Sequence, residues 1–144
     1  IMKKLIIILV FTFLVVTFPS WFIKPSIDGL ALPPFYPPTI LFPIVWTLLY
    51  ILMSISLYLA SKNTNSVYPI YIAQLIVNSL WTVIFFGLRL FTFGYLWIIL
   101  LITLVIIMMY KFYKQNKISM YLLIPYLIWL FIALYLNIGI AVLN

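Results

Sequence analysis

The sequence contains no cysteine, no histidine and no glutamate, and Asp28 carries its one side-chain carboxylate. Without cysteine, disulfides, thiol redox chemistry and thiolate metal ligation are all excluded. General acid–base catalysis, nucleophilic triads, and zinc or di-iron sites all draw on His, Cys, Asp or Glu. The composition therefore excludes most conventional enzyme mechanisms, and we expect no metal site.

Charge is also scarce, because only 6% of the 144 residues are charged while 68% are hydrophobic. This composition lies far outside that of soluble domains. A bilayer core needs roughly 20 apolar residues per helical crossing, and the sequence offers five such runs, at residues 5–22, 39–60, 67–87, 90–110 and 119–143. We predict an all-α integral membrane protein, a five-transmembrane-helix bundle that forms a single domain over residues 1–144.

The first apolar run also resembles a secretory signal, with Lys3 and Lys4 as its positive end. A cleavage site needs small residues at alternate positions, and Val16, Phe18 and their neighbours offer no such pair. We therefore expect a first helix that is retained.

The basic residues are distributed unequally between the two sides of a five-crossing bundle. Lys24 and Arg89 fall on one side. Six lysines fall on the other side, namely Lys3, Lys4, Lys62, Lys111, Lys114 and Lys117. By the positive-inside rule the amino terminus is expected to be cytoplasmic. The net charge of +7 then indicates contact with anionic membrane lipid, and nucleic acid is not an expected partner because there is no soluble basic surface.

One linker, residues 24–43, is long and rich in proline. Proline fixes φ and removes an amide donor, so this segment cannot be helical throughout. We expect a stiff, partly extended cap over one end of the bundle, with the second helix beginning near Pro37 and Pro38.

The third run contains two amides within an otherwise apolar helix. Gln74, Asn78, Trp81 and Phe85 recur at helical spacing and form one stripe. An unpartnered amide in hydrocarbon costs several kcal/mol, so the stripe should face the bundle interior. Two interpretations remain open: the amides hydrogen-bond a neighbouring helix, or they line a cavity.

The second and fifth runs carry aromatic faces of their own. These faces are Pro43, Trp46, Tyr50 and Met53 in the second run, and Tyr126, Trp129, Ala133 and Leu136 in the fifth. Aromatic residues near helix ends are expected at the membrane interface, namely Trp21, Tyr68, Tyr71, Tyr110 and Tyr113. Trp46, Trp81 and Trp129 lie further inside their helices. Together with Asn78 they could line a flat slot for a planar, mostly apolar ligand.

Three motifs occur in order on the second, third and fifth helices: "PPTILFPIVWTLLY", "QLIVNSLWTVIFFGLR" and "LLIPYLIWLFIALYLN". In this combination the chain resembles the translocator protein family, which comprises TspO and the mitochondrial peripheral-type benzodiazepine receptor. The resemblance covers nearly the whole chain, and the middle motif is the most specific.

The resemblance implies a bacterial cell-membrane protein, often a homodimer, that binds porphyrins, sterols and aromatic molecules beneath the loop between helices one and two. By position, the ligand-binding residues would be Trp46, Tyr50, Asn78, Trp81, Trp129 and Ala133. No cofactor is required, and a porphyrin such as protoporphyrin IX would be the ligand. Trp97 departs from the pattern, since relatives often carry an aspartate there.

Three functions remain open at this stage. The first is a porphyrin receptor that promotes light-dependent breakdown of its ligand, with Trp46 and Trp129 as tentative catalytic electron donors. Lack of histidine and cysteine argues against axial ligation of haem iron and favours a metal-free porphyrin. The alternatives are a transporter of porphyrin or sterol-like lipids, and a regulatory or scaffolding membrane protein.

Overall fold

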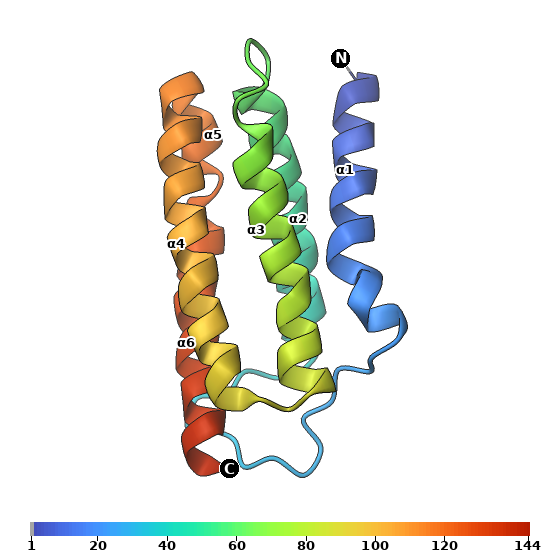
Figure 1. Ribbon diagram of the computed structural model, residues 1–144, viewed down its shortest axis with the longest axis vertical. Coiled ribbons are helices and arrows are strands. Elements are labelled where there is room, and N and C mark those ends of the chain that lie inside the picture. The colour runs from blue at the N-terminus through green and yellow to red at the C-terminus, as the bar shows by residue number, and fades with distance from the viewer. Residues whose placement is uncertain (1) are drawn as a thin grey trace.

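The computed structural model describes residues 2–144, where every regular element is helical (Figure 1). The helices are α1 (Met2–Thr17), α2 (Leu41–Ala60), α3 (Tyr68–Thr82), α4 (Phe91–Gln115), α5 (Lys117–Tyr121) and α6 (Ile124–Leu143), with short helices η1 (Phe18–Trp21) and η2 (Val83–Gly87). Five of these segments are long and apolar enough to span a membrane. This confirms the predicted all-α fold with five membrane spans. Ile1 lies outside the described residues.

Helix boundaries differ from the prediction in two places. Helix α2 begins at Leu41, so Pro37 and Pro38 belong to the cap and not to the start of the helix. Helix α4 continues past residue 110 to Gln115, and Lys114 lies in its last turn, where a cation interacts favourably with the helix dipole.

The fifth span is broken into α5 and α6. The side chain of Asn116 caps α5 by accepting hydrogen bonds from the backbone N–H groups of Ile118 and Ser119. Ser119 and Ser56 bond each other's backbone carbonyls through their hydroxyls, which fixes α5 against α2. Pro125 follows the break and occupies the first turn of α6, where its missing N–H is tolerated.

The third span ends in the π-helical turn η2 rather than in a regular α-helical turn. The backbone N–H of Leu88 donates to the carbonyl of Val83, five residues earlier. A π turn accommodates one extra residue and is frequent at functional sites. The chain then bends at Arg89, whose φ of 52° is in the left-handed region.

Helix α1 packs against α2 and α3 as a full member of the bundle. The hydroxyls of Thr12 and Tyr71 lie 2.6 Å apart, and both side chains are buried. Lys4 donates to the carbonyl of Ser61 at 3.0 Å, which places the amino terminus beside the α2–α3 joint. The burial of Tyr71 shows that its assignment to the interfacial aromatic belt was wrong. Its partner on α1 draws this tyrosine inward.

The cap between η1 and α2 runs across the end of the bundle that also carries the C-terminus (Figure 1). It lies directly on α6, because a Cβ atom at Gly139 would be only 2.5 Å from Cβ of Pro33. The Asn144 side chain exchanges two hydrogen bonds with the backbone of Ala31, and Tyr135 donates to the Pro34 carbonyl at 2.9 Å. The cap is therefore docked on the carboxyl half of α6.

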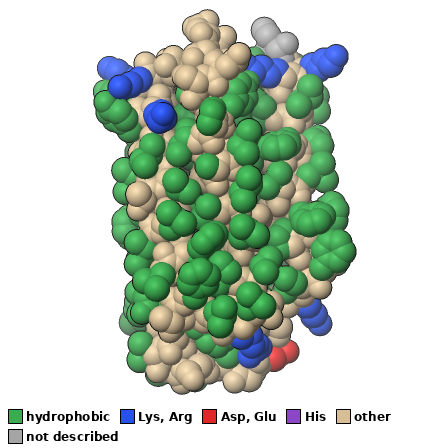
Figure 2. Space-filling view, viewed as in Figure 1, with side chains coloured by type: hydrophobic (Ala, Val, Ile, Leu, Met, Phe, Trp, Pro, Cys, Tyr) green, Lys and Arg blue, Asp and Glu red, His purple; other side chains and the backbone are tan. Residues whose placement is uncertain are grey.

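Basic side chains lie at the two ends of the molecule, and hydrophobic side chains cover the surface between them (Figure 2). This distribution is the one expected of a protein whose long axis crosses the bilayer.

The hydroxyl pair between α2 and α5 yields a stability prediction. Ser119→Ala removes a bond between buried groups, so we expect the free energy of unfolding in detergent to fall by about 1 kcal/mol. Thr103→Val is the matched control, because its hydroxyl bonds only its own helix at an exposed position, and we expect little change. Equal effects of the two variants would contradict a role for the pair in fixing α5.

Candidate functional site

The bundle holds a partly open cavity of about 480 Å³ near the cap. This volume falls within the range of roughly 300 to 1,000 Å³ that is typical of small-molecule sites. Side chains of every membrane span contribute to its wall, and cap residues including Pro25, Ile27 and Tyr36 also line it. The cavity lies where the cap closes the bundle.

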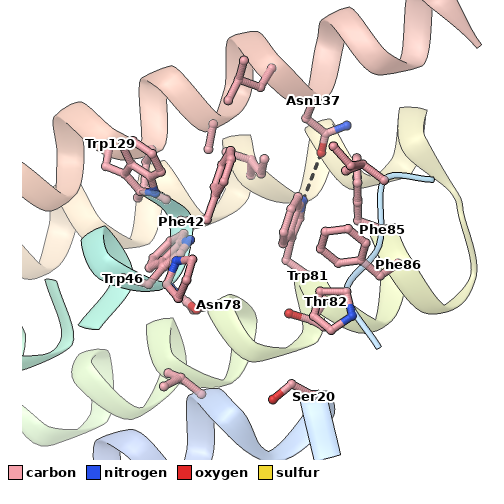
Figure 3. Close-up of a pocket in the computed structure, with 18 of the residues that line it drawn as sticks. Ser20, Phe42, Trp46, Asn78, Trp81, Thr82, Phe85, Phe86, Trp129 and Asn137 are labelled. Atoms are coloured by element: carbon pink, nitrogen blue, oxygen red, sulfur yellow. Dashed lines mark hydrogen bonds between the residues drawn. The ribbon is translucent and has the colours of Figure 1, made fainter. Parts of the chain in front are cut away.

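Aromatic rings form two groups around this cavity (Figure 3). In the first group Trp46 stacks on Tyr50 with ring centroids 5.4 Å apart. Trp46 also forms a T-shaped pair with Trp129, with ring centroids 6.4 Å apart. In the second group Trp81 stacks on Phe85 at 4.8 Å. In the close-up Trp46 and Trp129 lie apart from Trp81, Phe85 and Phe86.

A chain of buried hydrogen bonds lies beneath the first aromatic group. Tyr50 donates to Oδ1 of Asn78 at 3.3 Å, and Nδ2 of Asn78 donates to the Tyr126 hydroxyl at 2.8 Å. The Tyr126 hydroxyl in turn donates to Oε1 of Gln74 at 2.8 Å, and Nε2 of Gln74 lies 3.3 Å from the sulfur of Met53. The chain joins α2, α3 and α6.

This chain resolves the two interpretations of the amide stripe. Gln74 is fully buried and does not line the cavity, so it serves helix packing alone. Asn78 serves both purposes, because it holds two tyrosines and also lines the cavity.

The indole N–H groups of the interior tryptophans have different partners. Nε1 of Trp81 donates to Oδ1 of Asn137 at 3.0 Å (Figure 3). Nε1 of Trp97 donates to the Val77 carbonyl at 2.7 Å, and Trp97 does not line the cavity. Nε1 of Trp129 is buried and has no hydrogen-bond partner among the described residues. The Trp129 ring lines the cavity, but its N–H is enclosed by neighbouring protein atoms.

All six predicted site residues line this one cavity: Trp46, Tyr50, Asn78, Trp81, Trp129 and Ala133. Sequence reasoning about the site overlooked Phe42, Phe86, Thr82 and Asn137, which also line it. Helical periodicity could have found two of these, since Phe42 precedes Trp46 by four residues and Asn137 follows Ala133 by four.

The cavity has almost no formal charge. None of the described residues that line it is charged, and the polar groups of these residues are hydroxyls, two amides and the N–H groups of three indoles. Partial burial raises the pKa of the Tyr36 hydroxyl, so this side chain stays neutral through physiological pH and can donate a hydrogen bond. Within residues 2–144 no three carboxylate, imidazole or thiol groups cluster as metal ligands. The site can stack and hydrogen-bond a ligand, but it has no conventional acid–base pair.

Comparison with known proteins identifies relatives along nearly the full chain. The model of the TspO/MBR family matches residues 5–143. The chain is 39% identical over 133 residues to the tryptophan-rich protein TspO of Archaeoglobus fulgidus, covering 87% of this chain and 86% of the relative. It is 39% identical over 123 residues to protein CrtK of Rhodobacter capsulatus, covering 81% and 77%. It is also 35% identical over 139 residues to a translocator protein homolog of Schizosaccharomyces pombe, covering 87% and 85%.

The hydrogen-bond chain predicts an unequal cost for removing two asparagines. Asn78→Leu deprives Tyr50 and Tyr126 of a buried partner, so we expect the free energy of unfolding to fall by about 1 to 3 kcal/mol. Asn65→Leu is the control, since Asn65 is exposed in the α2–α3 joint. Denaturant titration in detergent measures both variants. A cost for Asn78→Leu no larger than for the control would show that the chain contributes nothing to stability.

Proposed function

The chain belongs to the TspO/MBR family of membrane proteins, and from this basis we propose that it is a membrane receptor for a porphyrin or a similar planar, mostly apolar molecule. One observation carries the proposal: the cavity of about 480 Å³ has the indoles of Trp46, Trp81 and Trp129 on its wall. Flat π surfaces favour a flat ligand, because stacking is strongest between extended parallel rings.

The chemistry around the cavity suits a metal-free porphyrin. Its lining includes no histidine, cysteine or methionine, which are common axial ligands of haem iron. The amides of Asn78 and Asn137 and the hydroxyl of Tyr36 supply hydrogen-bonding groups at the wall. Lys24 and Arg89 lie near the cap, where they could pair with acidic substituents on the edge of the ring system.

We also propose that light promotes oxidative breakdown of the bound porphyrin. The chemistry would belong to the excited ligand and molecular oxygen, and the protein would position the ligand and control access to it. Trp46 and Trp129 line the cavity with ring centroids 6.4 Å apart, so both indoles are placed to donate electrons to the excited ligand.

A transport function has one observation in its favour, the break between α5 and α6 in the fifth span. Transporters usually pair such breaks in repeated halves and place ionisable groups inside the membrane. The described lining of the cavity carries no charge, so we favour the receptor. A purely scaffolding role is less well supported, because the aromatic stripes line a cavity in addition to contacting one another.

We propose a bacterial cell membrane as the location, with the lysine-rich end of the bundle in the cytoplasm and in contact with anionic lipid. A homodimer is proposed from family membership alone.

The receptor proposal predicts tryptophan quenching by protoporphyrin IX in the dark. Titration into the detergent-solubilised protein should quench fluorescence saturably with a single apparent Kd. We expect Trp129→Phe and Asn78→Ala to weaken binding by about tenfold, since losing one well-placed contact costs roughly 1.4 kcal/mol. Trp97→Phe is the matched control, because its indole is hydrogen-bonded to Val77 away from the cavity. Unsaturable quenching, or equal effects of all three variants, would overturn the assignment.

The photochemical proposal predicts loss of porphyrin absorbance under illumination in the presence of oxygen. We expect the rate per bound porphyrin to fall several-fold in Trp46→Phe combined with Trp129→Phe, because phenylalanine is a much poorer electron donor than tryptophan. The measurement is made at saturating ligand, so that weaker binding does not mimic slower chemistry. An unchanged rate would remove both indoles from the mechanism while leaving the receptor proposal intact.

A further inference from the structure

A second hollow lies between α2 and α6, on the outside of the bundle. Its volume is about 350 Å³, and every side chain that lines it is apolar: Val45, Leu48, Leu49, Leu52, Pro125, Ile128, Trp129 and Ile132. Leu48 and Ile128 each expose 57% of their surface. Both residues belong to membrane-spanning helices, so this hollow, the α2–α6 groove, faces the hydrocarbon of the bilayer.

Trp129 lines both the α2–α6 groove and the central cavity. Its side chain is 7% exposed, so the ring is a buried partition between the two spaces. On one side the Trp129 ring forms T-shaped pairs with Phe42 and Trp46, with ring centroids 5.6 Å and 6.4 Å apart. Among the described residues, Trp129 is the one that lines both spaces.

Only packing holds the Trp129 ring in place. Its Nε1 has no hydrogen-bond partner within residues 2–144, whereas Trp81 and Trp97 are each anchored by an indole hydrogen bond. A change of rotamer at Trp129 therefore breaks no hydrogen bond. The same change at either of the other two tryptophans would leave a polar group unsatisfied inside the membrane.

The cap offers a more obstructed route to the cavity. It is held to α6 by the two Asn144–Ala31 hydrogen bonds and by the Tyr135–Pro34 hydrogen bond. Opening the cap would break these bonds and expose the contact between Pro33 and Gly139. Among the described residues, the cap is thus fixed by hydrogen bonds, whereas the Trp129 ring is held by packing.

We propose that the ligand reaches the central cavity from within the bilayer, through the α2–α6 groove, with the Trp129 indole as the gate. The inference rests on the proposed function, since it supposes an apolar planar ligand that partitions into lipid. The groove is lined by apolar side chains, so the apolar edge of such a ligand could enter it without exposing polar groups to hydrocarbon.

Stopped-flow tryptophan quenching by protoporphyrin IX, with the protein in lipid nanodiscs, tests the route. Leu48→Phe and Ile128→Phe each narrow the groove without touching the central cavity. We expect association and dissociation to slow by about tenfold while Kd stays within roughly twofold, because a barrier alone has changed. Ile51→Phe and Ile138→Phe are the matched controls on the same two helices, exposed and outside both spaces.

A second variant locks the cap. The chain has no native cysteine, so Pro33→Cys with Gly139→Cys introduces a single possible disulfide. A Cβ at position 139 lies 2.5 Å from Cβ of Pro33, and a shift of about 1 Å reaches disulfide geometry. We expect the association rate of the oxidised variant to lie within roughly twofold of the rate of the reduced variant. Trp129→Ala, which removes the gate, should accelerate association.

The outcomes separate the route from the proposed function. Saturable equilibrium quenching with slowed exchange in the groove variants, and unchanged exchange in the locked cap, supports the route. Slowing by the oxidised cap, or equal rates in the groove variants and their controls, overturns the route while leaving the receptor intact. Absence of saturable quenching in the unmodified chain overturns the proposed function and the route with it.

Discussion

A polar group buried in the hydrocarbon layer must find its hydrogen-bond partners within the protein, because no water is present to replace them. The chain from Tyr50 through Asn78 and Tyr126 to Gln74 meets this requirement across three helices. It ties α2, α3 and α6 together below the cavity, so these helices stay in register although a hollow separates them nearer the cap. Asn78 stands at the junction, since it supports this chain and also faces the hollow.

The rest of the site follows from this arrangement. Above the hydrogen-bond chain, Trp46 and Trp129 meet edge to face, while Trp81 is anchored to Asn137 on α6. Asn137 in turn donates to the carbonyl of Phe91 at the start of α4, so the fourth span is tied to the same wall. The cap closes the end because α6 presents it with a glycine, a tyrosine hydroxyl and an asparagine side chain. Helix α6 thus contributes to the wall, to the cover and to the partition facing lipid.

Much of this architecture could be predicted from the sequence, since long apolar runs can only be membrane spans and two amides in such a run must face inward. The six predicted site residues followed from helical periodicity and from family resemblance together. Tyr71 could not be placed correctly, because its burial depends on Thr12 in a distant helix. The break before Pro125 and the docking of Pro33 on Gly139 also depend on tertiary contacts. Helical periodicity predicts which side chains share one face of a helix. It does not predict which part of a loop packs on that face.

The π turn η2 contributes two aromatic side chains to the cavity wall. A regular α-helix advances by 100° per residue, so two consecutive side chains normally diverge around its axis. The wider turn at Val83–Gly87 holds one residue more per revolution, and there both Phe85 and Phe86 reach the cavity wall. The aromatic wall on this side therefore draws on the π turn as well as on the regular helix before it, which contributes Trp81.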